Sequence, residues 1–171
     1  MHVATAAAPA HGEVTGRSTV APMITWREFA AREPDLAAFG AQRLQAAPAY
    51  LATIRRSGAP RVHPVTPVVT RDGLYVFMEP TSPKGADLRH RRAYALHSGV
   101  PDMHGSGGEF LVSGEGRAIE DADVRAEAAD AAPYDPAEQY VLFELTLAEA
   151  RCNGYGDVPM PPRQRWSLHG G

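Results

Sequence analysis

Cysteine, long apolar runs and excess charge are all scarce in this sequence. Its single cysteine, Cys152, cannot form an intramolecular disulfide, which indicates a reducing compartment such as the cytoplasm and excludes a cysteine-rich zinc module. No stretch approaches the roughly 20 apolar residues that a transmembrane helix needs, so we expect no membrane association. A formal net charge of −3 gives no electrostatic reason to bind a polyanion, so we do not expect nucleic acid as a partner.

Several catalytic signatures are also missing. The seven histidines show no HExxH motif or similar paired spacing and have no cysteine companions, so we expect no dedicated metal site. There is no G-x-S-x-G nucleophile elbow, which argues against an α/β-hydrolase. Gly105, Gly107 and Gly108 follow no predicted strand and precede no predicted helix, so they form neither a dinucleotide-binding loop nor a P-loop.

The composition is that of one globular domain. The sequence is 44% hydrophobic and 22% charged, close to the averages for globular proteins, and 171 residues are enough to bury a core without disulfides. Residues 1–22 are rich in Ala, Gly, Thr and Pro and lack the basic start and long apolar centre of a signal peptide, so they predict a flexible tail. We therefore expect a single domain over residues 23–171.

Short strands separated by turn signals dominate the rest of the sequence. We predict strands over residues 50–56, 61–70, 74–79, 94–98, 109–120 and 138–150. The first three are expected to pair in chain order as a meander. Thr25 and Glu28 match a capping box and predict a helix from residue 25 to the interruption at Pro34. Further helices are predicted over 34–44, from the 80–85 stretch to about residue 90, and over 121–131. This pattern favours a mainly β (α+β) fold, a barrel of about six antiparallel strands with small flanking helices.

The segment from Thr81 to Gly85 has the features of an anion site. Ser82 is a good helix cap, and proline fits the first helical position that follows it, so free amides point at one spot. Lys84 adds a positive charge, and Gly85 leaves room where a ligand would approach. The segment therefore predicts a phosphate site. The alternative from this motif alone is an ordinary solvated helix start.

Arg61 opens the strand that precedes this segment. In the predicted meander its strand pairs through a tight turn with residues 74–79, which lead directly to the Ser82 cap. The guanidinium of Arg61 could therefore reach the same anion and make two parallel bonds to it. A surface arginine beside a turn is the alternative that the spacing leaves open.

Pro64 and Pro67 interrupt the same strand. Since proline cannot donate to a sheet ladder, this strand must have an unpaired flank. A flat heteroaromatic ring could dock there by hydrogen bonds to backbone groups that the sheet leaves free. We expect these to be the backbone groups of His63, Val65 and Thr66. The alternative is an edge strand that its prolines protect from aggregation.

These segments together resemble the FMN-binding split-barrel family of pyridoxamine 5'-phosphate oxidase-like proteins. The resemblance covers roughly residues 50–120, with a looser match to Trp166, and is carried by residues 52–69, 74–78, the Ser82-Pro83-Lys84-Gly85 turn and 94–97. It implies a split β-barrel, usually a homodimer with two cofactor sites at its interface. It also implies the following cofactor-binding residues: Arg61, Val62, His63, Pro64, Val65, Thr66, Thr81, Ser82 and Lys84.

The resemblance implies a flavin-dependent oxidoreductase that transfers two electrons to or from a small organic substrate. His63 is the expected proton donor, because imidazole changes charge near neutral pH, and Tyr155 is the second candidate. The family's oxidases bind vitamin B6 phosphates through a C-terminal arginine and histidine that the ending after Arg163 does not match well. Two alternatives remain. One is a flavin-binding or sensor module without turnover. The other is a deazaflavin-dependent reductase, whose longer anionic tail could use the basic residues Arg55, Arg56, Arg89, Arg91 and Arg92.

Overall fold

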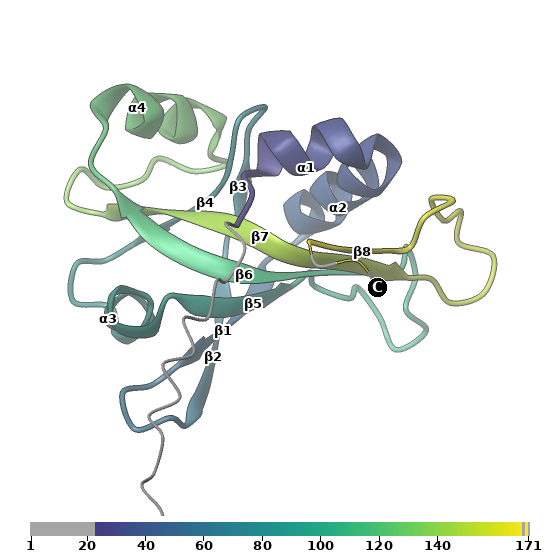
Figure 1. Ribbon diagram of the computed structural model, residues 1–171, viewed down its shortest axis with the longest axis horizontal. Helices are drawn as coiled ribbons and strands as arrows, with labels where there is room; N and C mark the ends of the chain where they lie inside the picture. Colours follow the sequence, from purple (N-terminus) through teal and green to yellow (C-terminus); the bar gives the residue numbers. More distant parts are fainter. Residues whose placement is uncertain (1–22, 169, 171) are drawn as a thin grey trace, which may run out of the picture.

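The computed structural model describes residues 23–168 and 170. Over these residues eight strands form one curled antiparallel sheet in the order β2-β1-β5-β6-β7-β4-β3, with β8 paired to β7 (Figure 1). The strands are β1 (Ala49–Ile54), β2 (Pro60–Val65), β3 (Val68–Val69), β4 (Leu74–Met78), β5 (Ala93–His97), β6 (Glu109–Ile119), β7 (Val141–Asn153) and β8 (Arg165–Ser167). The tail predicted over residues 1–22 lies outside the described residues.

Four helices of the described chain accompany the sheet. They are α1 (Trp26–Arg32), α2 (Pro34–Ala46), α3 (Pro83–Arg91) and α4 (Ala122–Ala131). The predicted capping box is present, because the Glu28 amide donates to the Thr25 hydroxyl at 3.3 Å and the Thr25 amide donates to the Glu28 carboxylate at 2.8 Å. No helix among the described residues is long and apolar enough to cross a bilayer.

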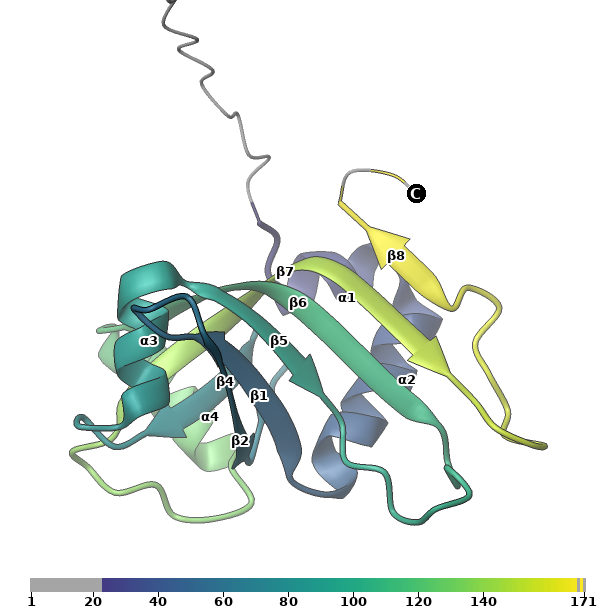
Figure 2. The ribbon, with the colours of Figure 1, turned by 90° about the horizontal axis from the view of Figure 1, so that it is seen from below.

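The main core lies between the concave face of the sheet and the helices α1 and α2 (Figure 2). The rings of Trp26 and Phe29 lie 5.4 Å apart, and Phe29 lies 5.2 Å from Trp166, so α1 is joined to β8 through aromatic packing. A Cβ at Gly40 would lie 2.4 Å from the Phe110 ring. Only glycine therefore lets α2 approach the sheet this closely.

The predicted helices and the mixed, mainly β architecture are confirmed, but two features of the strands differ from prediction. β8 falls in a segment for which we expected no strand, and the predicted strand 138–150 begins at Val141 and runs on to Asn153. The predicted strand 61–70 is broken at residues 66–67 into β2 and β3. Pro67 explains this break, since it cannot donate to a ladder.

The predicted meander is confirmed for its first pair of strands, β1 and β2, but the expected pairing of β2 with β4 is wrong. In the described part of the chain β2 pairs with β1 alone, and of the predicted strand 61–70 only the short β3 pairs with β4. β2 and β3 lie at opposite ends of the strand order, so residues 66–67 carry the chain from one edge of the curled sheet to the other. This crossing closes the sheet toward a barrel, and among residues 23–168 no strand pairs with the far flank of β2.

Candidate functional site

Arg61 is fixed against helix α3 by a buried carboxylate. It lies opposite Thr53 in the β1–β2 register. Its Nε donates to Asp87 Oδ2 at 2.7 Å, and the Thr53 hydroxyl donates to the same oxygen at 2.9 Å. Asp87 is only 8% exposed. The contact uses Nε of the guanidinium, and within the described residues neither Nη atom of Arg61 has a hydrogen-bond or ion-pair partner.

The first turn of α3 has the predicted capping geometry. The buried Ser82 hydroxyl accepts from the Gly85 amide at 3.4 Å, and proline occupies the first helical position. Lys84 is half-buried, and among the described residues its ammonium group has no ion-pair or hydrogen-bond partner. It precedes Asp87 by one turn, about 4.5 Å along the helix axis at 1.5 Å per residue. The structure therefore brings Arg61, through Asp87, to the same helical face as Lys84.

The expectation for Gly85 is wrong. A Cβ built on this residue would make ordinary contacts, 3.5 Å from the ring of Phe143 and 3.6 Å from the sulfur of Met78. Gly85 therefore faces the hydrophobic core and not the surface where a ligand would approach. The two side chains that position Arg61, Thr53 and Asp87, were not identified from the sequence.

The backbone groups that β2 leaves free can be derived from its ladder. The Arg55 amide donates to the Ala59 carbonyl at 2.9 Å, so Arg55 and Ala59 form a hydrogen-bonded pair of the β1–β2 ladder. In an antiparallel ladder every second pair is hydrogen-bonded, and counting from this pair the bonded residues of β2 are Arg61, His63 and Val65. His63 and Val65 are therefore bonded to β1, and our expectation that their backbone groups are free is wrong. Val62 instead directs both its N–H and its C=O to the unpaired flank. Pro64, which has no N–H, directs its carbonyl there.

The side chains of the predicted site lie on two faces of β2. Arg61 and His63 are on the α3 side and half-buried, whereas Val62 projects from the opposite face and is 60% exposed. Thr81 is exposed beside the Ser82 cap. No described residue makes a hydrogen bond to the His63 ring.

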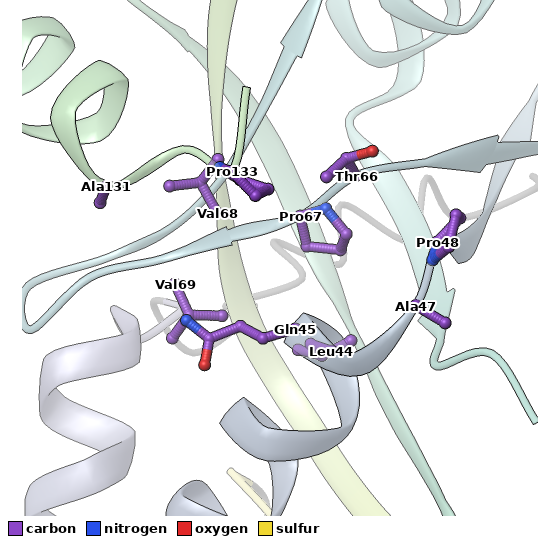
Figure 3. Close-up of a pocket in the computed structure, with 10 residues that line it drawn as sticks. All are labelled: Leu44, Gln45, Ala47, Pro48, Thr66, Pro67, Val68, Val69, Ala131 and Pro133. Carbon is purple, nitrogen blue, oxygen red and sulfur yellow. The ribbon is translucent and has the colours of Figure 1, made fainter. Parts of the chain in front are cut away.

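Thr66 lies apart from the other predicted site residues. It follows β2 and lines a separate, mostly apolar pocket of about 280 Å³ between the end of α2, residues 66–69 and the segment after α4 (Figure 3). None of the five pockets described along residues 23–168 is lined by Arg61, Ser82 or Lys84.

Tyr155 lies far from α3. Its hydroxyl donates to Glu109 at 3.4 Å, at the start of β6. Helix α3 meets β6 near Gly116, whose amide donates to the Arg92 carbonyl. Seven residues of strand separate Glu109 from Gly116, about 23 Å at 3.3 Å per residue. The second predicted proton donor is therefore not brought to the α3 site.

The convex face of the sheet carries an apolar surface over β2, β1 and β5. Its side chains alternate with buried ones along each strand and include the exposed Tyr50 and Ile54. We call this set the convex apolar face: Tyr50, Ala52, Ile54, Pro60, Val62, Pro64, Ala93 and Ala95. A shallow pocket of about 250 Å³ with an almost wholly apolar lining lies within it. Such a face is typical of a protein–protein contact surface.

The sequence matches no protein-family model and no curated protein. Solved structures do resemble this chain. A candidate pyridoxamine 5'-phosphate oxidase from Listeria innocua matches with a TM-score of 0.56 at 14% identity, over 71% of this chain and 97% of that chain. General stress protein 26 from Bacillus anthracis matches with a TM-score of 0.57 at 15% identity, over 77% of this chain and 97% of that chain.

A heme-binding protein has the same architecture. The heme binding protein from Mycobacterium smegmatis matches with a TM-score of 0.57 at 18% identity, over 76% of this chain. The match spans only 57% of that protein's length. At these identities the likeness concerns the fold.

Proposed function

The chain has the split-barrel fold of the pyridoxamine 5'-phosphate oxidase-like proteins, and from this premise we propose that it is a flavin-dependent oxidoreductase that binds FMN at the first turn of α3. Its substrate would be a small organic molecule that exchanges two electrons with the flavin. Bound FMN would supply the hydride chemistry, and the protein would bind, orient and shield the reacting groups. The proposed site comprises Arg61, Val62, His63 and Pro64 together with Thr81, Ser82 and Lys84.

The observation that carries this proposal is the contact between Arg61 and Asp87. It holds the guanidinium of Arg61 on α3 within about one helical turn of Lys84, and it leaves the Nη edge of Arg61 available to a phosphate. The Ser82 cap and the Lys84 ammonium supply the other half of an anion site. A phosphate group would then bind between two cations at a capped helix start.

The free flank of β2 suits the ring of the cofactor. Val62 offers one N–H and one C=O there, and Pro64 offers a further carbonyl, which matches the alternating donors and acceptors along the edge of an isoalloxazine ring. His63 lies on the same face of the strand as Arg61 and stays our proposed proton donor. Its imidazole would transfer a proton to or from the substrate.

The open position of this site supports a homodimer. In one protomer no described pocket covers the phosphate position, while the convex apolar face begins on the same strand β2. A second copy packed on this face would bury Tyr50, Ile54 and Val62 and would exclude water from the ring. We therefore place the two cofactor sites at the border of this interface.

A deazaflavin is the second candidate cofactor. Arg91, near the end of α3, donates to the backbone carbonyl of Arg56 at 3.3 Å, so basic side chains follow α3 beyond Asp87 toward the β1–β2 turn. These residues could bind a longer anionic tail. A flavin-binding module without turnover would have the same site. Only a measurement of catalytic activity distinguishes such a module from an enzyme.

Titration of the apoprotein with FMN tests the proposal. Lys84→Ala removes a charged contact to the phosphate and should weaken FMN binding by about 1.5–3 kcal/mol. Arg89→Ala changes the same charge on the same helix, where Arg89 lies over the Phe143 ring, and should leave the affinity unchanged. Mass spectrometry of the ligand that copurifies separates FMN from a deazaflavin. Equal FMN affinities for the wild type and Lys84→Ala would refute the site.

A further inference from the structure

Two arginines face each other across β7 and β8. Arg151 pairs directly with Arg165 in the strand register. The flanking bonds, from the Cys152 amide to the Gln164 carbonyl at 2.9 Å and from the Leu168 amide to the Ala148 carbonyl at 2.8 Å, mark the hydrogen-bonded positions of this ladder. Arg151 and Arg165 therefore form a non-hydrogen-bonded pair, the type with the closest side chains, in which the Cα atoms are about 4.5 Å apart.

This pair has no compensating carboxylate. Like charges directly opposite each other destabilise a sheet, and both arginines are exposed. Within residues 23–168 and 170, neither side chain makes an ion pair or a hydrogen bond. Glu149 lies on the same face, two residues before Arg151, but it forms no ion pair with either arginine. Arg163, by contrast, is paired with Glu33 at 2.7 Å.

The two arginines line one pocket of about 270 Å³. Leu111 pairs with Arg151 on the other side of β7, so its side chain lies on the same face as the arginines and supplies the apolar wall. Ala150 and Trp166 point to the core on the opposite face and line the pocket with their backbone, and Glu149 and Ser167 complete the lining. The volume is close to the lower limit of about 300 Å³ for ligand pockets, so only a small molecule fits. The pocket thus combines two guanidinium groups with the apolar side chain of Leu111 and a single carboxylate, that of Glu149, and keeps a net positive charge.

We propose that this pocket binds the oxyanion group of a small organic molecule, a carboxylate or phosphate on an apolar body. The anion would bind between the Arg151 and Arg165 guanidinium groups and relieve their mutual repulsion, because planar guanidinium groups bind carboxylate and phosphate oxygens in pairs. The apolar body would contact Leu111.

This site is separate from the proposed flavin site. β8 lies at one end of the molecule and α3 at the other (Figure 2). The inference therefore does not depend on flavin binding, and a ligand at each site can be detected independently.

Benzoate is a suitable probe, with benzyl alcohol as its neutral analogue. In amide NMR spectra of ¹⁵N-labelled protein, benzoate should shift the backbone signals of Leu111, Arg151 and Trp166 in a saturable way, and benzyl alcohol should not. The double substitution R151Q/R165Q should weaken benzoate binding at least about tenfold, since each charged hydrogen bond lost costs on that scale. Because it removes a repulsive pair, this variant should fold as well as the wild type.

Two controls make the result decisive. R71Q removes one positive charge from an exposed residue of the turn before β4 and should bind benzoate like the wild type. Inorganic phosphate, tested in the Lys84→Ala background, should still shift the backbone amide signal of Trp166. Unchanged benzoate affinity in R151Q/R165Q would overturn the proposal, as would benzoate-induced shifts centred on α3. Neither of these outcomes affects the flavin proposal, which Lys84→Ala tests separately.

Discussion

The buried contact between Arg61 and Asp87 predicts strong energetic coupling between these two residues. The Asp87 side chain is 9% exposed and that of Arg61 is 20% exposed. Arg61→Met keeps most of the apolar stem but leaves the Asp87 carboxylate with the Thr53 hydroxyl as its one partner among the described residues. Breaking a buried pair in this way costs about 3–5 kcal/mol, and because some water reaches Arg61 we expect a loss near about 3 kcal/mol.

The double variant separates the pair from the general cost of each substitution. Asp87→Asn removes the charge with little change in shape, so Arg61→Met should cost far less in that background, with a coupling energy of about 2 kcal/mol. Urea unfolding followed by circular dichroism gives each free energy of unfolding by linear extrapolation. If the two substitutions add to within about 0.5 kcal/mol, Asp87 does not hold Arg61 and the positioning argument fails.

Three further predictions concern packing and ionisation. Gly114→Ala should lower the free energy of unfolding in urea by about 1–3 kcal/mol, because the added Cβ would lie 1.9 Å from the Thr146 carbonyl oxygen. Gly85→Ala is the control: its Cβ would make contacts of 3.5 Å or more, so this variant should be neutral or stabilising. Burial and the nearby Glu144 raise the pKa of Tyr75 to about 12, so the neutral phenol favours the folded state. The free energy of unfolding should therefore fall as the pH rises from 10 to 12, and Tyr75→Phe should not show this fall. Burial also raises the pKa of the Cys152 thiol, so a disulfide reagent at pH 8 should react with it only after unfolding; fast reaction of the native protein would contradict its burial.

Local sequence signals predicted the local structure well. The capping box at Thr25 and the proline start of α2 depend on neighbouring residues only, and both are present. The Ser82 cap of α3 belongs to the same class. Such features are set within one turn of chain, so no tertiary information is needed to predict them.

The partners of the strands were harder to predict. Nothing local distinguishes a meander from a sheet in which β2 and β3 lie at opposite edges, because the choice depends on how the whole sheet closes. The same limit hid Asp87, whose partners Thr53 and Arg61 come from another part of the chain. β8 was missed because a three-residue strand in a proline-rich segment has too short a pattern to detect.

The comparison of FMN with riboflavin tests the central claim most directly, because the two molecules differ only in the phosphate. If Arg61 and Lys84 bind that phosphate at the capped start of α3, the wild type should bind FMN at least about a hundredfold more tightly than riboflavin, which corresponds to two charged hydrogen bonds. In Lys84→Ala this preference should fall at least about tenfold, with riboflavin affinity unchanged. Equal binding of FMN and riboflavin by the wild type would contradict the account.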